Sequence, residues 1–180
     1  MNICVFCASA PQTSEAFKAE ARLIGNFIAE QGHTLVYGGA TGGLMDAVAE
    51  AVHEGGGDII GVVPQVIVDK GRKSTLPDQL YIVGDMSERK EMMKEFSDVF
   101  IVLPGGFGTF DEMCDAIASG MIGFHDGKVI VVNSDDYYAG LIALIDRMHH
   151  ENLGYNLKDG ILKIVNSAEE CINYLQTIQQ

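Results

Sequence analysis

Short runs rich in β-branched and aromatic residues alternate along this chain with segments of helical periodicity. Most of the short runs are apolar throughout, which is typical of parallel strands that are covered on both faces. The predicted strands are Ile3–Cys7, Thr34–Tyr37, Ile59–Val63, Leu80–Val83, Val99–Leu103 and Lys128–Val132. The predicted helices contain the stripe Phe17, Ala21, Ile24 and Ile28, then Leu44–Val52, Glu88–Phe96, Asp111–Ile122, Tyr138–His149 and Ala168–Ile178.

This alternation predicts an α/β fold, namely a Rossmann-like, doubly wound and mostly parallel sheet with helices on both faces. The chain has 180 residues, no internal repeat and no linker, so we expect one nucleotide-binding domain over residues 1–180. Ligands of such sheets bind at the carboxyl ends of strands, so functional residues are expected in the turns that follow strands. The irregular segment Gln65–Asp78 carries Lys70, Arg72 and Lys73 and is either a loop at the edge of the site or a solvated loop.

The charge balance limits the possible partners. Twenty-five acidic against twelve basic residues give a net charge of −13, which argues against a nucleic-acid partner. An anionic ligand would then depend on backbone N–H groups and one or two well-placed cations. No apolar run reaches the roughly 18 residues of a membrane span, and no signal peptide is apparent, so we expect a soluble, cytoplasmic protein without a membrane partner.

The cysteines do not suggest a metal or redox site. Cys4 and Cys7 form a CxxC motif inside a predicted strand, where residues three apart point to opposite faces. No second cysteine or histidine pair has ligand spacing. We therefore expect both thiols to pack in the core, and we predict no metal and no cofactor.

Two glycine-rich turns follow predicted strands and open directly into predicted helices. They are Gly38-Gly39-Ala40-Thr41-Gly42-Gly43 and Gly105-Gly106-Phe107-Gly108-Thr109. Either turn is suited to hold a phosphate against a helix N-terminus, and either is equally well explained as a tight structural turn. Leu44 and Met45 replace the Lys and Ser/Thr of a Walker A loop, and neither turn gives a full dinucleotide fingerprint.

The second turn carries the stronger functional signal. Pro104 to Glu112 combines a strand end, a phosphate-sized turn and a carboxylate. Thr109-x-x-Glu112 is also a capping box, in which Glu112 would only start the helix. Arg89 and Lys90 offer cations for the same cleft, although alone they would be read as a solvated helix face.

These motifs together resemble the lonely-guy (LOG) family of phosphoribohydrolases, long mislabelled as lysine decarboxylases. The resemblance covers most of the chain and rests on Val5 to Ser9, Val36 to Gly39, Gly43 to Met45, Met86, Arg89-Lys90, Pro104 to Glu112, Gly123-x-His125 and Tyr138. It implies a Rossmann-like homodimer that hydrolyses a nucleoside 5′-monophosphate, either a cytokinin riboside 5′-monophosphate or AMP, to free base and ribose 5-phosphate.

The resemblance also implies roles for individual residues. Arg89 and Glu112 would be the catalytic pair. The substrate would be bound by Ser9, Gly38, Gly39, Thr41, Gly42, Gly43, Met86, Lys90, Gly105, Gly106, Gly108 and Thr109. Ser9 would reach the ribose or the base, or would simply form a turn, and Thr109 would cap the helix as well as bind phosphate. Ala40, Asp46, Asp115, Ser119, Gly120 and Met121 depart from the family pattern and bear on base specificity and rate.

Other functions remain open from the sequence. A non-catalytic nucleotide or molybdenum-cofactor carrier would use the same fold and turns. A pyridoxal-phosphate lysine decarboxylase would need a Schiff-base lysine, for which Lys90 is the only near candidate. A housekeeping hydrolase of surplus nucleotides would use the same chemistry. Met92, Met93 and Phe96 are predicted to lie on an exposed helix and to form part of a dimer seam.

Overall fold

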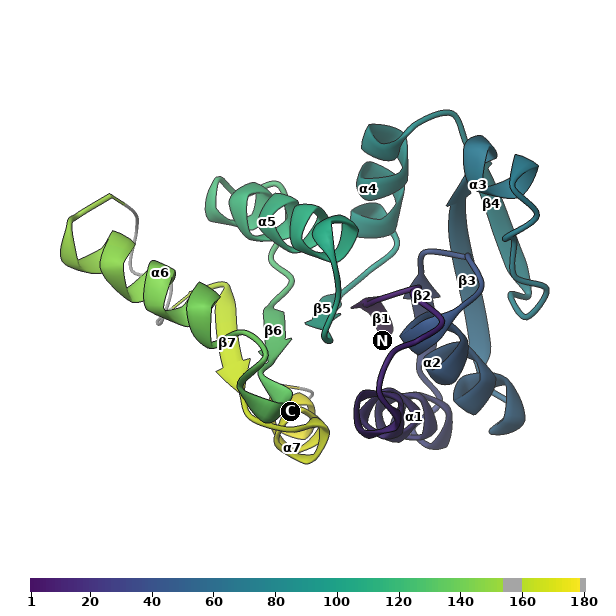
Figure 1. The fold of residues 1–180 in the computed structure, drawn as a ribbon, viewed down its shortest axis with the longest axis horizontal. Helices are drawn as coiled ribbons and strands as arrows, with labels where there is room; N and C mark the ends of the chain where they lie inside the picture. The colour runs from purple at the N-terminus through teal and green to yellow at the C-terminus, as the bar shows by residue number, and fades with distance from the viewer. Residues whose placement is uncertain (154–159, 179–180) are drawn as a thin grey trace.

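A seven-stranded parallel sheet forms the centre of the computed structural model, which describes residues 1–153 and 160–178 (Figure 1). The strand order is β4-β3-β2-β1-β5-β6-β7, and every neighbouring pair is parallel. The strands are β1 (Asn2–Phe6), β2 (Thr34–Tyr37), β3 (Asp58–Pro64), β4 (Gln79–Val83), β5 (Val99–Val102), β6 (Val129–Val132) and β7 (Leu162–Val165). The predicted α/β class, with a parallel sheet and helices on both faces, is confirmed.

The helices connect the strands in the expected alternation. They are α1 (Glu15–Glu30), α2 (Gly43–Glu54), α3 (Gln65–Asp69), α4 (Met86–Glu95), α5 (Phe107–Met121), α6 (Ala139–His150) and α7 (Ala168–Ile178), with a 3₁₀ turn at Ser134–Asp136. Two elements were not predicted: the edge strand β7, and the five-residue helix α3 at the start of a segment that was expected to be irregular. No helix among the described residues is long and apolar enough to cross a membrane.

Each face of the sheet has its own apolar core. Ile24 and Ile28 of α1, Leu44 and Val48 of α2 and Cys171 of α7 belong to one core cluster. Met93 of α4, Met113 of α5 and Phe100 of β5 belong to the other. Side chains alternate along β1, so Cys7 packs in the first cluster and Cys4 in the second. The prediction that both thiols of the CxxC motif are core residues is confirmed.

The α4 helix is held by a polar cap and by packing against the core. Asp85 caps its N-terminus, where its carboxylate accepts hydrogen bonds from the N–H groups of Ser87 and Glu88 at 2.8 and 2.9 Å. Within the helix only Arg89 and Met93 are buried. The expectation that Met93 belongs to an exposed dimer seam is wrong, because it is fully buried; Met92 and Phe96 also pack against the core.

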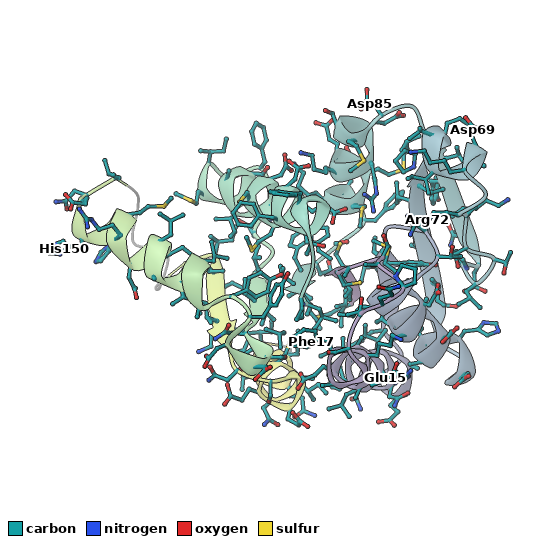
Figure 2. The ribbon with its side chains drawn as sticks, in the orientation of Figure 1. Glu15, Phe17, Asp69, Arg72, Asp85 and His150 are labelled. Carbon is teal, nitrogen blue, oxygen red and sulfur yellow. The ribbon has the colours of Figure 1, made fainter. Side chains whose placement is uncertain are left out.

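The order of the strands creates a switch point beside β1. From β1 the chain builds outward through β2 and β3 to β4, and then returns to place β5 on the other side of β1. Connections therefore leave β1 and β5 in opposite directions, which opens a crevice at their carboxyl ends. The turns that follow β1, β2 and β5 all lie at this edge. The α6 helix has no buried residue and extends away from the sheet, with His150 at its far end (Figures 1 and 2).

Candidate active site

A cleft of about 250 Å³ lies at the carboxyl ends of β1 and β5. It is lined by Cys7, Ala8, Ser9, Ala10, Met45, Arg89, Gly106, Gly108, Thr109 and Glu112. A larger hollow of about 350 Å³ lies between α5 and α6, but its lining is almost wholly apolar and includes neither Arg89 nor Glu112. The smaller cleft is therefore the candidate active site, because it holds the convergent polar groups.

Arg89 and Glu112 form a buried ion pair at the floor of the cleft. Arg89 comes from α4 and Glu112 from α5, and Arg89 Nη1 lies 2.9 Å from Glu112 Oε1. The exposed fractions of the two residues are 7% and 2%. Arg89 Nε donates a hydrogen bond to the Val62 carbonyl at 3.1 Å, and Nη1 lies 3.8 Å from the sulfur of Met86. These contacts fix the guanidinium between β3 and Glu112.

The electrostatic surroundings of Glu112 suit a group that takes up a proton. Burial raises the pKa of Glu112 above its ordinary value of 4.5; the charge of Arg89 opposes this effect, and the charge of Asp111 adds to it. Glu112 Oε1 is fully buried and has no hydrogen-bond donor in suitable geometry among the described residues. The 2.9 Å contact with Arg89 thus provides charge pairing and leaves a lone pair of Oε1 without a hydrogen bond.

The turn after β5 brings backbone N–H groups to the cleft. The α5 helix begins at Phe107, and its N-cap is Gly106, which makes no side-chain cap hydrogen bond. Gly106, Gly108 and Thr109 line the cleft, so the unpaired N–H groups of the first turn lie beside Arg89 and Glu112. A Cβ atom at Gly105 would overlap the side chain of Thr109, so only glycine fits this approach.

The predicted capping box is not formed. Because Gly106 is extended and its carbonyl already accepts a hydrogen bond from the Phe110 N–H, the helix starts two residues before Thr109. Thr109 is therefore a residue of the first turn and not the N-cap, and the predicted capping role of its side chain is wrong. Glu112 is consequently not engaged in starting the helix and faces the cleft instead.

The glycine turn after β2 packs against the loop after β1, which lines the cleft. Gly39, Gly42 and Gly43 have φ angles of 62°, 112° and 59°, which favour glycine. Leu44 and Met45 N–H groups at the start of α2 are already used, since both donate to the Ala8 carbonyl at 2.9 and 3.3 Å. Gly38, Gly39, Thr41, Gly42 and Gly43 are absent from the cleft lining. Their predicted contact with substrate stays a prediction, whereas Gly42 and Gly43 pack closely against the backbone of the loop after β1.

Lys90 points away from the cleft. Its ammonium group lies 2.9 Å from Asp111 and 3.5 Å from Asp115. Burial acts to lower the pKa of Lys90, but the hydrogen bond and charges of these carboxylates outweigh it and raise the pKa. One turn further along α4, Lys94 lies 2.5 Å from Asp115 and donates a hydrogen bond to Ser119 at 3.0 Å. The four charged residues and Ser119 form a polar ladder between α4 and α5.

Sequence reasoning missed several parts of the site. Cys7, Ala8, Ala10 and Met45 line the cleft, and Ser9 joins them as predicted. Cys7, Ala8 and Ala10 reach the cleft because β1 ends at Phe6, whereas the predicted strand ended at Cys7. The predicted residues Met86 and Gly105 lie directly behind the lining, against Arg89 and Thr109 respectively.

Arg72, between α3 and β4, is a further residue whose role was not predicted (Figure 2). Its Nη2 donates hydrogen bonds to the carbonyls of Ser9 at 3.0 Å and Thr41 at 2.7 Å. The Thr41 N–H donates to the Arg72 carbonyl at 2.8 Å. Arg72 thereby joins the loop after β1 to the loop after β2. No sequence pattern signals such a role, because the partners are main-chain carbonyls.

Comparison with known proteins places the chain in one family. The family model described as possible lysine decarboxylase matches residues 45–175. The cytokinin riboside 5′-monophosphate phosphoribohydrolase LOG3 of Arabidopsis thaliana is 34% identical over 175 residues, which cover 97% of this chain and 81% of that protein. LOGL5 of Oryza sativa subsp. japonica, described as a probable enzyme of the same activity, is 40% identical over 150 residues. That match spans 83% of this chain and 61% of LOGL5, somewhat less than two thirds of its length.

Solved structures show the same fold at lower identity. The molybdenum cofactor binding protein from Rippkaea orientalis superposes with a TM-score of 0.75 and 23% identity, over 99% of this chain and 97% of that one. The molybdenum cofactor carrier protein of Chlamydomonas reinhardtii gives a TM-score of 0.75 and 21% identity, with the same coverage. These similarities concern the fold alone. The family follows from the sequence matches: this chain belongs to the LOG family of cytokinin riboside 5′-monophosphate phosphoribohydrolases.

Proposed function

We propose that this protein hydrolyses the N-glycosidic bond of a nucleoside 5′-monophosphate, releasing the free base and ribose 5-phosphate. The observation that carries the proposal is the buried Arg89–Glu112 pair, 2.9 Å apart in a cleft that also receives the N-terminus of α5. The proposed substrates are cytokinin riboside 5′-monophosphates, which the names of the relatives give as theirs, and AMP.

The pair supplies what hydrolysis at C1′ of the ribose requires. As the bond to the base breaks, positive charge develops on the ribose, and the Glu112 carboxylate stabilises this charge. A water molecule then bonds to C1′, and Glu112 accepts the proton that the water loses. The electron pair of the broken bond leaves with the base, which takes up a proton from solvent. The net reaction consumes one water molecule.

Arg89 and the first turn of α5 would orient the substrate for this step. The guanidinium would donate hydrogen bonds to phosphate or ribose oxygens through the N–H groups that Val62 and Glu112 leave free. The N–H groups near Gly106, Gly108 and Thr109 suit the phosphate, since the N-terminus of a helix carries partial positive charge. Ser9, on the opposite side of the cleft, is proposed to contact the ribose or the base.

Base release from AMP and from isopentenyladenosine 5′-monophosphate tests the proposal, with the free base followed by chromatography. Glu112→Gln keeps the shape of the side chain but removes the carboxylate, and is expected to lower base release at least about 100-fold, in the range of general acid–base catalysis. Glu169→Gln is the matched control, because Glu169 is exposed on α7. Equal activity of Glu112→Gln and the unchanged protein would refute the assignment. Tight binding of AMP without base release would instead identify a non-catalytic carrier.

A lysine decarboxylase activity finds less support in the site. Among the described residues that line the cleft there is no lysine. Lys90, the nearest one, is held by Asp111 and Asp115 outside the cleft. These contacts favour the charged ammonium form, whereas Schiff-base formation needs the neutral amine.

We also propose that the protein is a homodimer that buries the apolar surface of α6. Leu144, Met148 and Leu153 are 47%, 40% and 77% exposed beside the hollow between α5 and α6. A second copy of the chain would remove this surface from water. Light scattering of the purified protein is expected to give twice the mass of one chain, and Leu144→Asp is expected to shift it toward the monomer. A monomeric mass for the unchanged protein would contradict the proposal.

A further inference from the structure

Four residues lead from β5 into α5, and the first three each have a carbonyl oxygen that accepts a hydrogen bond from outside this turn. The Tyr138 hydroxyl donates to the Leu103 carbonyl at 2.8 Å, and the Tyr137 hydroxyl donates to the Gly105 carbonyl at 2.7 Å. Between them, the Ala8 N–H donates to the Pro104 carbonyl at 3.1 Å. Two adjacent tyrosines from the segment after β6 therefore hold both ends of Leu103-Pro104-Gly105.

The hydrogen bond from Tyr137 determines the orientation of the peptide group that joins Gly105 to Gly106. In a planar trans peptide the C=O and N–H bonds point in opposite directions. Tyr137, Gly105 and Gly106 line a second hollow. Arg89 and Glu112 line the cleft but not this hollow. Because the Gly105 oxygen is held toward Tyr137, the Gly106 N–H points away from it, and Gly106 lines the cleft.

Without this hydrogen bond the peptide group would be easily reoriented. It lies between two glycines, which have no Cβ atom to restrict their backbone angles. A reversed peptide would turn a carbonyl oxygen toward the position of the phosphate, where two negative groups repel each other. An anion site needs N–H groups that face the ligand. By holding the Gly105 carbonyl, the Tyr137 hydroxyl keeps the N–H side of this peptide group toward the phosphate.

The backbone before the tyrosines is held in an uncommon conformation. Asp135 and Asp136 have φ angles of 52° and 54°, in the left-handed region that few non-glycine residues adopt. Asn133 stabilises this turn, since its Oδ1 accepts a hydrogen bond from the Tyr138 N–H at 2.7 Å. The ring of Tyr137 packs edge-on against Phe17, with centroids 5.7 Å apart. Backbone strain that persists beside a site is typical of segments that position functional groups.

We propose that Tyr137 is a positioning residue that holds the phosphate-binding turn of the active site in its anion-accepting orientation. The inference rests on the proposed function for the identity of the ligand, a nucleoside 5′-monophosphate. Tyr137 lies outside the cleft, and we expect it to affect the binding of the phosphate group but not of the base or the ribose. Adenosine, which has the same base and ribose but no phosphate, should therefore be insensitive to Tyr137.

Tyr137→Phe tests the proposal, because it removes one hydroxyl and keeps the ring against Phe17. The net worth of one hydrogen bond corresponds to a rise of about two- to tenfold in the KM and the dissociation constant for AMP. We expect kcat to change less than KM, the affinity for adenosine to stay unchanged, and the Tm to fall by no more than about 4 °C, as the loss of one hydrogen bond requires. Tyr81→Phe is the matched control, since the Tyr81 hydroxyl bonds to Gln79 on the edge strand, away from the cleft.

Binding and turnover are measured separately. A failure of the positioning role of Tyr137 can then be distinguished from a failure of the proposed hydrolysis. Calorimetric binding of AMP and adenosine in a Glu112→Gln background reports on Tyr137 even if the unchanged protein releases no base. Equal AMP affinity with Tyr or Phe at position 137, or an equal loss for AMP and adenosine, would overturn the positioning role. A loss for AMP alone would support it whatever reaction the cleft performs.

Discussion

Gly38, at the end of β2, lies directly against the guanidinium of Arg89. A Cβ atom added to Gly38 would overlap Arg89 Nη2 and would also approach the Met45 side chain to 2.9 Å. Gly38 does not have a positive φ angle, so alanine is compatible with the backbone itself. The need for glycine here is thus set by the space that the catalytic pair occupies, and not by the turn.

Gly38→Ala is therefore expected to inactivate the protein by displacing Arg89 from Glu112. A shift of about 1 Å in such a pair costs on the order of 100-fold in rate, and overpacking costs about 1–3 kcal/mol of unfolding free energy. Base release and urea unfolding measure the two effects. Gly140→Ala is the control, because a Cβ at Gly140 meets no atom within 4 Å. Full activity of Gly38→Ala would show that Arg89 does not need its observed position.

The activity is expected to fall at acidic pH with an apparent pKa above 4.5. The proposed mechanism uses the ionised form of Glu112, and burial raises the pKa of this carboxyl in the folded protein. The same shift affects stability with a defined sign. Because the folded state binds this proton more tightly than the unfolded chain, the contribution of protonated Glu112 is fully present below about pH 4.5 and is lost as pH rises through the folded pKa.

Carbon NMR of the Glu112 carboxyl group provides a direct measurement of this pKa. Arg89→Met removes the opposing positive charge, so Glu112 is expected to titrate at a still higher pH in that variant. A Glu112 carboxyl that titrates below 4.5 in the unchanged protein would mean that the charge of Arg89 outweighs burial.

The polar ladder between α4 and α5 is expected to maintain the distance between Arg89 and Glu112. Asp115→Lys places a cation opposite Lys94 and Lys90 and should lower both base release and stability, the latter by about 1 kcal/mol. The additional change Lys94→Asp reverses the pair and should restore part of both. High salt should weaken the ladder in the unchanged protein. If the double variant is no better than Asp115→Lys alone, the charges do not act as a pair.

One of the four thiols should react with a thiol reagent ahead of the other three, most readily in the Leu144→Asp variant, because Cys114 lines the hollow that the proposed dimer would cover. Cys114 is exposed on α5, whereas Cys4, Cys7 and Cys171 are buried. Burial raises the pKa of all four thiols, that of Cys171 to about 12, so access to the reagent sets the order in which they react. Spectrophotometric titration should count one thiol in buffer and four in urea, and Cys114→Ser should remove the native reaction. Rapid reaction of a second thiol would contradict the burial of the CxxC pair.

The sequence was sufficient for the parallel sheet because six of the seven strands are apolar runs bounded by turns. It was not sufficient for β7, because the exposed Lys163 interrupts the apolar run in Leu162-Lys163-Ile164-Val165. Within the site, the pairing of Arg89 with Glu112 was predictable through resemblance, because motif residues carry it. The contacts of Arg72 and Tyr137 were not, since their partners are carbonyl groups that every residue has.

The first strand of the chain ends up at the middle of the sheet, between β2 and β5. During synthesis β1 can pair with β2 soon after both leave the ribosome, but its other edge stays open until Val99–Val102 has been made. An unpaired apolar edge is prone to association with other chains. The cleft is assembled at the same late stage, because the turn into α5 follows directly after β5. The second edge of β1 is thus covered at the stage when the cleft begins to form, whereas Tyr137 and the strand that covers β5 are made later.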